Sequence, residues 1–364
     1  PVKRLLPAWT KWPRIDFYLL AALLLLVSLG LLVLYSASGE NMDVVIRQGV
    51  RLGVGLVAML VISQVPPHIM RIWTPWLYVI GVALLLATWF VGTGRATNRW
   101  LDLGFFRFQP SEVMKLAVPM MVAWYLHPRR LPPAFGRLLV SLVILVVPAV
   151  LIARQPDLGT ALLVGVSGLF ALFLSGLQWR VIFGFVGLGV ASAPALWFVM
   201  KDYQRQRVLT FLDPESDPLG SGWNIIQSKI AVGSGGLFGK GWLNGTQSRL
   251  EFIPERHTDF ILAVLSEEFG LIGILILFTL YLFIVGRCLY IATMARDTYS
   301  RLLAGSLGLT FFIYVLVNAG MVSGLLPVVG VPLPLVSYGG TSIVTLLAGF
   351  GILMSVYGHR NFLR

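Results

Sequence analysis

The sequence predicts an all-α integral membrane protein: a bundle of ten transmembrane helices with a long extracytoplasmic loop between helices 7 and 8. Of its 364 residues, 57% are hydrophobic and 12% are charged, whereas about a quarter of the residues of a soluble domain are charged. Apolar runs of the length that crosses a bilayer, about 20 residues, recur along the chain. Basic residues recur in the gaps between alternate runs, as they do around oriented membrane helices.

The ten predicted helices follow the apolar runs in chain order. No small-residue cleavage site follows the first run, so we expect it to remain as an anchor rather than to act as a removed signal peptide. The expected spans lie near residues 16–38, 45–64, 73–92, 111–126, 138–153, 158–176, 180–200, 259–286, 302–325 and 338–357. The chain, 1–364, is then expected to be a single polytopic membrane domain without a separate soluble domain.

The formal net charge of +12 comes from Lys and Arg residues that are scattered over the gaps. They do not form the basic stripe of a nucleic-acid-binding surface, so no nucleic-acid partner is predicted. An even number of crossings places both termini on one side, and the positive-inside rule makes that side cytoplasmic. The residues that support this orientation are Lys3, Arg4, Lys11, Arg14, Arg71, Arg129, Arg130, Arg137, Arg180, Arg287, Arg296, Arg301, Arg360 and Arg364.

A second group of basic residues is expected on the opposite side of the membrane. Cations there work against the orientation signal, which indicates that they bind something anionic. Long loops escape the rule, however, so a purely structural interpretation stays open for the residues of the long gap. The group consists of Arg95, Arg99, Arg107, Arg154, Lys201, Arg205, Arg207, Lys229, Lys240, Arg249 and Arg256.

The gap 201–258 is too long for a simple connection and too rich in Trp and Phe for a disordered segment. We expect this extracytoplasmic loop to fold against the membrane, with a short helix over 223–232 and turns elsewhere. Its glycine-rich run GSGGLFGKG, 233–241, resembles a phosphate-binding loop. Ser234 and Gly241 break the P-loop pattern, and the third glycine of a dinucleotide fingerprint is missing. Neither ATP nor NAD is therefore predicted.

Several ionisable side chains are expected at or just inside the membrane on the non-cytoplasmic side. Such positions are energetically costly, so their occupants are candidates for function. Lys115 lies one helical turn beyond Glu112, on the same face of its helix. Glu267 and Glu268 lie in the eighth span, about two turns below Asp259. The structural alternative is an interhelical ion pair between Lys115 and one of these two glutamates.

Two aspartates lie where helices are expected to begin. Asp157, in QPDLGT, takes the N-cap position of the sixth span, and Asp259, in PERHTDFI, falls in the first turn of the eighth. Capping or a favourable interaction with the helix dipole could explain either residue without catalysis. Two proline-containing segments, RFQPSE at 107–112 and LLPVVGVPLPLVSYGG at 325–340, break helices at the membrane edge. Irregular backbone at that depth is buried in protein or lines a wet cavity, so we expect a cleft there.

Motifs along nearly the whole chain resemble those of the SEDS (shape, elongation, division and sporulation) family. They are RWLDLG at 99–104, FQPSE with Lys115, QPDLGT at 155–160, GSGGLFGKG, PERHTDFI at 254–261 and NAGMVSGLLPVVGVPLPLVSYGG at 318–340. The run DPESDPLGSGWNIIQSKIA resembles the elongation branch of the family, that of RodA, more than the division branch, that of FtsW. The resemblance implies a ten-helix glycosyltransferase. Such an enzyme polymerises lipid II into peptidoglycan strands on the outer, periplasmic face of the bacterial cytoplasmic (inner) membrane.

The resemblance also implies which residues form the site. The aspartate of PERHTDFI is the essential catalytic candidate in the family, and it corresponds to Asp259 in this sequence. Supporting importance attaches to the Trp of RWLDLG, to the Glu and Lys of the QPSE segment and to the Asp of QPDLGT. These residues correspond to Trp100, Glu112, Lys115 and Asp157.

The charged residues of this sequence also suit glycosyl transfer independently of the resemblance. Glycosyl transfer from a lipid diphosphate needs one base and much positive charge, because the leaving group is already activated and anionic. Our hypothesis is that Asp259 deprotonates the 4-hydroxyl of the acceptor's N-acetylglucosamine, which attacks C1 of the donor's muramyl sugar with inversion. Burial would raise the pKa of Asp259, whereas Arg256, His257 and the helix dipole would lower it. An alternative is that His257 relays the proton. The candidates for diphosphate contacts are Arg99, Arg107, Lys115, Arg205, Arg207 and Arg256.

The sequence predicts no certain cofactor. It contains no dedicated metal cage, although a divalent cation, Mg²⁺ or Mn²⁺, could assist at the diphosphate. The partners that the resemblance implies are lipid II, undecaprenyl diphosphate, a class B penicillin-binding protein with transpeptidase activity and other membrane proteins of the elongation complex.

Two rival functions stay open. One is a flippase that moves the lipid-linked precursor across the membrane, and the other is a scaffold without catalysis. Buried charges suit a transporter too, but many transporters place their site near the bilayer midplane between repeats. The charges in this sequence are expected to cluster at one face of the membrane.

Overall fold

The computed structural model describes residues 15–92, 99–102, 107–155, 157–200, 202–216, 222–249, 252 and 255–359. These residues are largely helical, with one short antiparallel pair, β1 (Leu101–Asp102) and β2 (Arg107–Phe108). The α-helices are α1 (Phe17–Ala37), α2 (Met42–Gln64), α3 (Pro67–Val91), α4 (Pro110–Leu126), α5 (Phe135–Arg154), α6 (Leu158–Leu174), α7 (Trp179–Val199), α8 (Asp202–Leu212), α9 (Trp223–Ser234), α10 (Thr246–Arg249), α11 (Ile261–Thr293), α12 (Thr298–Val322) and α13 (Thr341–Gly358).

The helices confirm the predicted membrane character of the chain. Within the described ranges, seven helices are long and apolar enough to cross a bilayer, namely α1, α2, α3, α5, α11, α12 and α13. The apolar helix α6 is shorter, at 17 residues. Each of the ten predicted spans overlaps a helix, the remaining ones being α4, α6 and α7.

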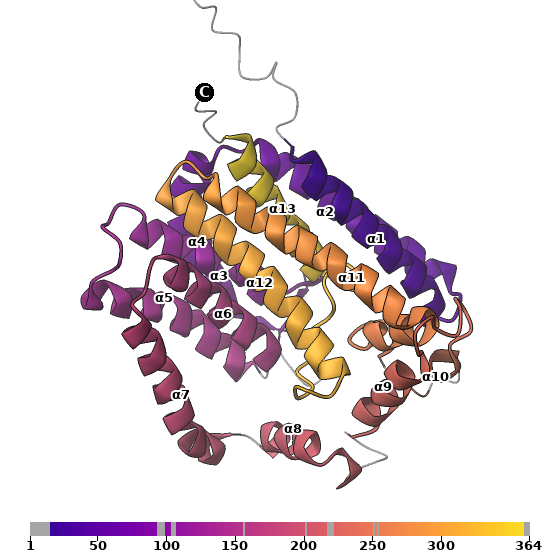
Figure 1. Cartoon of the computed structure of the whole chain (residues 1–364). Helices are drawn as coiled ribbons and strands as arrows, with labels where there is room; N and C mark the ends of the chain where they lie inside the picture. Colours follow the sequence, from indigo (N-terminus) through magenta and orange to yellow (C-terminus); the bar gives the residue numbers. More distant parts are fainter. Residues whose placement is uncertain are drawn as a thin grey trace, which may run out of the picture.

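The centre of the bundle is α12, which packs against α4, α6, α9, α11 and α13 (Figure 1). Small residues allow the close approach of neighbouring helices that membrane interiors favour. Gly308 of α12 lies against Cys288 of α11, and Gly55 of α2 lies against Leu347 of α13, so that a Cβ atom at either glycine would clash. The irregular segment between α12 and α13 lies close to α1 and α6, where Gly30 and Gly159 contact its backbone.

The two ends of the described chain meet at one end of the bundle (Figure 1). Asp16 caps α1 and accepts a hydrogen bond from Arg287 Nε at 2.7 Å. The Arg287 guanidinium also lies 5.6 Å from the ring centre of Tyr357, near the end of α13. Asp259 precedes α11, whereas Arg287 lies near the far end of that helix. At about 1.5 Å per helical residue, the two residues are separated by roughly 40 Å along the bundle.

The segment between α7 and α11 is more helical than predicted. The expected short helix is confirmed as α9, which packs against α11 and α12. The expectation of turns elsewhere is wrong, because α8, a 3-10 turn at Pro214–Ser216 and α10 also form. Arg205 of α8 donates hydrogen bonds to the carbonyls of Trp197 and Phe198, both at 2.9 Å. It thereby satisfies carbonyl groups near the C-terminal end of α7.

The glycine-rich run 233–241 fills a break in α11. The helix is interrupted at Gly270, whose φ is 63° and ψ −159°. Leu271 N donates to Gly236 O at 2.9 Å, and Gly241 N donates to Glu268 O at 3.0 Å. The backbone of Gly239 lies so close to Glu268 O that a side chain would not fit there. The glycines therefore serve close backbone packing, which explains the run without a bound phosphate.

Candidate active site

Asp259 lies in the turn 255–260 that leads into α11. Its carbonyl oxygen accepts a hydrogen bond from Asn318 Nδ2 at 2.9 Å, and the same amide donates to Val331 O at 2.8 Å. Asn318 on α12 thus ties the turn to the irregular segment before α13. Among the described residues, the Asp259 carboxylate itself has no hydrogen bond or ion pair, so it is available to a ligand.

The two aspartates for which capping was predicted behave differently. Asp157 is the N-cap of α6, and its Oδ1 accepts a hydrogen bond from Thr160 N at 3.1 Å. Its Oδ2 accepts from Gln109 Nε2 at 3.0 Å and pairs with Arg99 at 3.2 Å. Capping is wrong for Asp259, because α11 begins only at Ile261 and its N-cap residue makes no side-chain cap bond. Helix capping therefore does not explain why an aspartate stands at position 259.

Burial decides the basicity of Asp259. It raises the pKa of the carboxyl to about 6, the neighbouring charge of Glu255 adds to the rise, and the charge of Arg207 opposes it. A carboxyl with this pKa is mostly ionised at neutral pH and is a better proton acceptor than an ordinary aspartate. The predicted rise of the pKa through burial is confirmed, and the charge that opposes it is that of Arg207 rather than the predicted Arg256 or His257.

A polar cavity of about 230 Å³ lies next to Asp259 and confirms the expected cleft between the proline-containing segments and the bundle. We call it the central cavity. Gly330 forms part of its wall, and a Cβ atom on Gly330 would lie 3.5 Å from Asp259 Oδ2. The lining residues are Arg99, Trp100, Gln109, Glu112, Lys115, Asp157, Thr160, Leu163, Tyr314, Gly330, Val331, Pro332, Gly340, Thr341 and Ser342.

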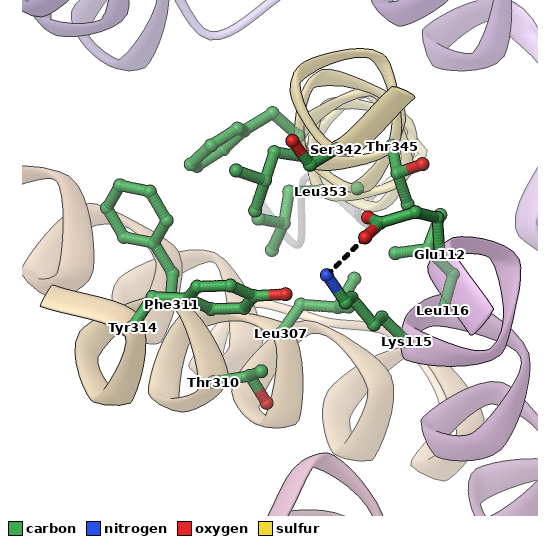
Figure 2. Close-up of a pocket in the computed structure, with 13 residues that line it drawn as sticks. Glu112, Lys115, Leu116, Leu307, Thr310, Phe311, Tyr314, Ser342, Thr345 and Leu353 are labelled. Carbon is green, nitrogen blue, oxygen red and sulfur yellow. Dashed lines mark hydrogen bonds and ion pairs between the residues drawn. The ribbon is translucent and has the colours of Figure 1, made fainter. Parts of the chain in front are cut away.

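A buried ion pair lies at one side of the central cavity. Lys115 Nζ and Glu112 Oε1, both on α4, are 2.7 Å apart, and both side chains are buried. Figure 2 shows this pair facing Tyr314 of α12 and the N-terminal turns of α13. A small extension of about 40 Å³ continues between these helices. The predicted pair between Lys115 and Glu267 or Glu268 is wrong, because Glu112 lies on the same helical face and is one turn away.

Glu267 and Glu268 instead hold the extracytoplasmic segment on α11. Glu267 Oε1 accepts hydrogen bonds from Lys240 Nζ at 2.7 Å, Thr246 N at 2.8 Å and Gln247 N at 3.0 Å. Glu268 Oε1 accepts a short hydrogen bond from Ser36 Oγ of α1. Neither carboxylate lines the central cavity. Their role is to attach the segment around α10 to the helix that follows Asp259.

We expect Glu267→Gln to loosen this attachment. The amide keeps the shape but loses the charge that strengthens the bonds from Lys240 and the two backbone amides, at a cost of about 1–3 kcal/mol. Limited trypsin digestion in detergent should show faster cleavage at Lys240 and Arg249 than in the wild type. Glu215→Gln changes an exposed carboxylate of the same segment and should leave cleavage unchanged. Equal cleavage of all three proteins would contradict the role of Glu267.

The remaining predicted residues divide into two groups. Arg99 and Lys115 line the central cavity, but each is paired with a carboxylate. Arg205 binds α7 carbonyls and lies 3.9 Å from Asp202, so it is used within the fold. Near Asp259, Arg207 acts on the carboxyl through its charge, and Arg256 and His257 belong to the same turn. The side chain of Arg107 lies outside the described residues.

His257 is positioned by the segment before α13. Its carbonyl oxygen accepts a hydrogen bond from Tyr338 N at 2.8 Å, and its ring packs edge-on against the Tyr338 ring at 5.9 Å. The Arg51 guanidinium also lies 4.6 Å from the Tyr338 ring centre. The contacts described for the imidazole are thus those of packing, and they favour a positioning role over a proton relay.

Four residues of the site were not singled out from the sequence: Asn318, Tyr314, Gly330 and Thr341. Asn318 and Gly330 lie within a motif that was noted as a whole, and a lone amide in an apolar helix could have drawn attention to Asn318. Tyr314 lies in the apolar run LTFFIYVLVN, where its hydroxyl gives no periodic signal. Only the packing of α4, α12 and α13 brings these residues together.

Comparisons with known proteins agree with this architecture. The family model of the cell cycle proteins FtsW, RodA and SpoVE matches residues 16–361. The chain is 55% identical over 358 residues to the peptidoglycan glycosyltransferase MrdB of Escherichia coli K12, covering 97% of each protein. It is 35% identical to the probable peptidoglycan glycosyltransferase FtsW of Trichlorobacter lovleyi, covering 94% of this chain and 92% of the relative.

Two solved structures share the fold. A chain of a peptidoglycan synthase complex, described for its coordination of polymerization and crosslinking, superposes with a TM-score of 0.84 at 32% identity. The alignment covers 96% of this chain and 100% of that one. The rod shape determining protein RodA of Thermus thermophilus superposes with a TM-score of 0.73 at 28% identity, covering 97% and 99% of the two chains. The likeness therefore extends over the bundle and the site alike.

Proposed function

This chain belongs to the FtsW, RodA and SpoVE family and is a peptidoglycan glycosyltransferase. We propose that Asp259 is the general base with which it polymerises lipid II. The observation that supports the proposal is the free, half-buried carboxylate of Asp259 beside a polar cavity, with its pKa raised to about 6. A base is most effective when its pKa lies near the working pH.

The step needs one proton acceptor. The 4-hydroxyl oxygen of the acceptor's N-acetylglucosamine attacks C1 of the donor's muramyl sugar, and a new glycosidic C–O bond forms. The hydroxyl proton passes to the Asp259 carboxylate as the bond from C1 to the diphosphate oxygen breaks. Undecaprenyl diphosphate leaves with its electron pair, and the configuration at C1 is inverted. A single carboxylate suffices, because the leaving group needs no protonation, unlike that of a glycoside hydrolase.

Positive charge beside the base would stabilise the departing diphosphate. The candidates are Arg207, whose charge acts on the Asp259 carboxyl, and Arg256, which belongs to the same turn as Asp259. Within the described ranges, no group of three or more His, Cys, Asp or Glu side chains could hold a metal ion. The described residues thus do not form a cluster of the kind that holds a resident metal ion. We propose that Mg²⁺ or Mn²⁺, where it takes part, is bound chiefly by the diphosphate oxygens.

The chain is a multi-pass protein of the inner membrane, and we propose ten crossings with both termini in the cytoplasm. Asp16, Arg287 and Tyr357 meet at one end of the bundle, and Asp259 lies at the other. Arg71 and Arg129 flank helices at the end that holds the termini, as the positive-inside rule requires for the cytoplasmic side. Asp259 and the central cavity would then face the periplasm, where lipid II is consumed.

The same comparisons support the proposal of a transpeptidase partner. One solved neighbour is a chain of a peptidoglycan synthase complex that couples polymerization to crosslinking. We propose that this chain works with a class B penicillin-binding protein and with other membrane proteins of the elongation complex. Exposed apolar side chains occur on helices all round the bundle, so many faces could pack against a single membrane helix.

The proposal is tested with the purified protein and lipid II in detergent, where no membrane sidedness exists. We expect glycan polymer from the wild type, with a penicillin-binding partner supplied. Polymer that persists with Asp259→Ala would show that another group is the base. No polymer from the wild type under any of these conditions would favour the flippase or the scaffold instead.

The pH dependence of the polymerisation rate should follow the protonation state of the Asp259 carboxyl. Since the pKa of Asp259 is raised to about 6, the base is protonated and inactive below that pH. We expect the polymerisation rate to rise about tenfold per pH unit below pH 6 and to level off above pH 7. Glu255→Gln removes a charge that raises the pKa, so its profile should shift to lower pH. A profile that falls across this range would contradict the assignment.

A further inference from the structure

The central cavity is close to electrically neutral. Its described lining holds two cations, Arg99 and Lys115, and two carboxylates, Asp157 and Glu112. Each cation contacts one carboxylate, at 3.2 Å for Arg99 with Asp157 and 2.7 Å for Lys115 with Glu112. A diphosphate entering the cavity would face both carboxylates and would compete with them for the cations. The charges therefore favour an uncharged ligand over an anionic one.

The cavity also presents polar atoms that no described group satisfies. The hydroxyls of Tyr314 and Thr341 and the Oε2 atom of Glu112 are buried without a hydrogen-bond partner. In Figure 2, the Tyr314 hydroxyl points towards the pair of Lys115 and Glu112, and Lys115 Nζ lies 5.3 Å from the centre of the Tyr314 ring. Tyr314 is only 3% exposed and Glu112 only 5%. Unpaired polar groups at such depth are expensive, so their natural counterpart is a ligand rich in hydroxyl and amide groups.

The volume of the central cavity limits the size of the ligand. The volume of about 230 Å³ is below the roughly 300–1,000 Å³ of pockets that enclose a drug-sized molecule. One sugar ring is therefore a better match than a disaccharide. Trp100, half-buried in the lining, offers a flat apolar face for such a ring.

The position of the cavity indicates which sugar it takes. Gly330, in the cavity wall, lies beside Asp259 Oδ2. The side-chain amide of Asn318 donates hydrogen bonds both to the carbonyl of Val331, another wall residue, and to the carbonyl of Asp259. In lipid II the muramyl ring carries the diphosphate and an acidic peptide, whereas the N-acetylglucosamine ring is uncharged and terminal. Only the latter brings a free 4-hydroxyl next to the base.

We propose that the central cavity binds the N-acetylglucosamine ring of the acceptor lipid II, and that Tyr314 and Thr341 are specificity-determining residues that hydrogen-bond to it. The inference rests on the proposed function, since it places the acceptor hydroxyl within reach of Asp259. It differs from the prediction that Arg99 and Lys115 contact the diphosphate. That group would lie outside the cavity, nearer to Arg207 and Arg256.

The test compares binding of two natural lipids that differ only in this ring. Lipid II carries N-acetylglucosamine, and lipid I lacks it. Both are titrated onto full-length Asp259→Asn protein, which should not turn over. We expect lipid II to bind on the order of 10-fold to 100-fold more tightly than lipid I, as one or two buried hydrogen bonds would give. Adding Tyr314→Phe or Thr341→Val should cut this ratio several-fold by weakening lipid II alone.

Two matched controls accompany these variants. Tyr125→Phe and Thr279→Val remove the same hydroxyls from positions outside the cavity and should leave the ratio unchanged. In the Asp259-containing enzyme, Tyr314→Phe and Thr341→Val should raise the KM for lipid II with a smaller change in kcat. Equal weakening of lipid I and lipid II would place the diphosphate or peptide in the cavity and overturn the proposal.

The outcomes also separate this inference from the proposed function. If the wild type polymerises lipid II but the ratio of the two affinities does not respond to Tyr314→Phe or Thr341→Val, the sugar assignment is wrong and the function stands. If the wild type forms no polymer, the function fails whatever the ratio. Because each change at Tyr314 or Thr341 removes a single hydroxyl group and nearly keeps the size of the side chain, a monodisperse elution profile is expected for every variant.

Discussion

Asp259→Asn is expected to reduce polymerisation by at least about 10²–10⁴-fold, the contribution of a general base. The amide keeps the size of the side chain and cannot accept the hydroxyl proton as a carboxylate does. The turn should survive, because it is attached through the Asp259 carbonyl oxygen to Asn318 and not through the carboxylate. The measurement is the initial rate of polymer formation from lipid II. Glu255→Gln, in the same turn, is the matched control and should keep most of the activity.

The same variant should be at least as stable as the wild type at neutral pH. A carboxyl whose pKa is raised from 3.8 to about 6 stabilises the fold when protonated, and this stabilisation is lost as the pH rises through 6. At about 1.4 kcal/mol per pKa unit, ionisation costs up to about 3 kcal/mol. We therefore expect the Tm advantage of Asp259→Asn to be small at pH 4, to grow between pH 4 and about pH 6, and to level off by pH 8. A variant that is less stable at pH 8 would show that the carboxylate is a structural group.

Lys115→Met is expected to destabilise the bundle by about 3–5 kcal/mol, because it leaves the Glu112 carboxylate buried without its counter-ion. The pair is 2.7 Å apart and both side chains are less than a tenth exposed. Thermal unfolding in detergent measures the effect, and polymerisation should fall in parallel. Lys229→Met, which changes an exposed lysine on α9, is the control and should have a much smaller effect.

The double variant Glu112→Gln with Lys115→Met separates the contribution of the ion pair to stability from its contribution to activity. It removes both charges, so most of the lost stability should return, since an uncompensated buried charge is the main cost. Activity should stay at least about tenfold low, because the cavity loses polar groups that, on our proposal, surround the acceptor sugar. Full recovery of both stability and activity would show that the pair only holds α4 in place.

The behaviour of the glycine-rich run shows where local patterns are ambiguous. GSGGLFGKG has the composition of a phosphate-binding loop, and its deviations from that pattern were visible in the sequence. Its actual partner, the interrupted backbone of α11 around Gly270, is 30 residues further along the chain and is recognisable only in three dimensions. The missed helix α8 has a similar cause, since a polar segment of marginal helix propensity is fixed by the contacts of Arg205 with α7.

The sequence by itself determined that this protein is a helical membrane protein, where its helices run and which motifs surround Asp259. Those properties follow from free energies of transfer summed over one continuous segment at a time. The tertiary structure alone decided that Asp157 caps a helix while Asp259 does not, that Lys115 pairs with Glu112, and that Tyr314 faces a cavity beside the base. These outcomes depend on residues from α4, α6, α12 and α13 that meet in space, and neither burial nor pairing is a property of any one segment.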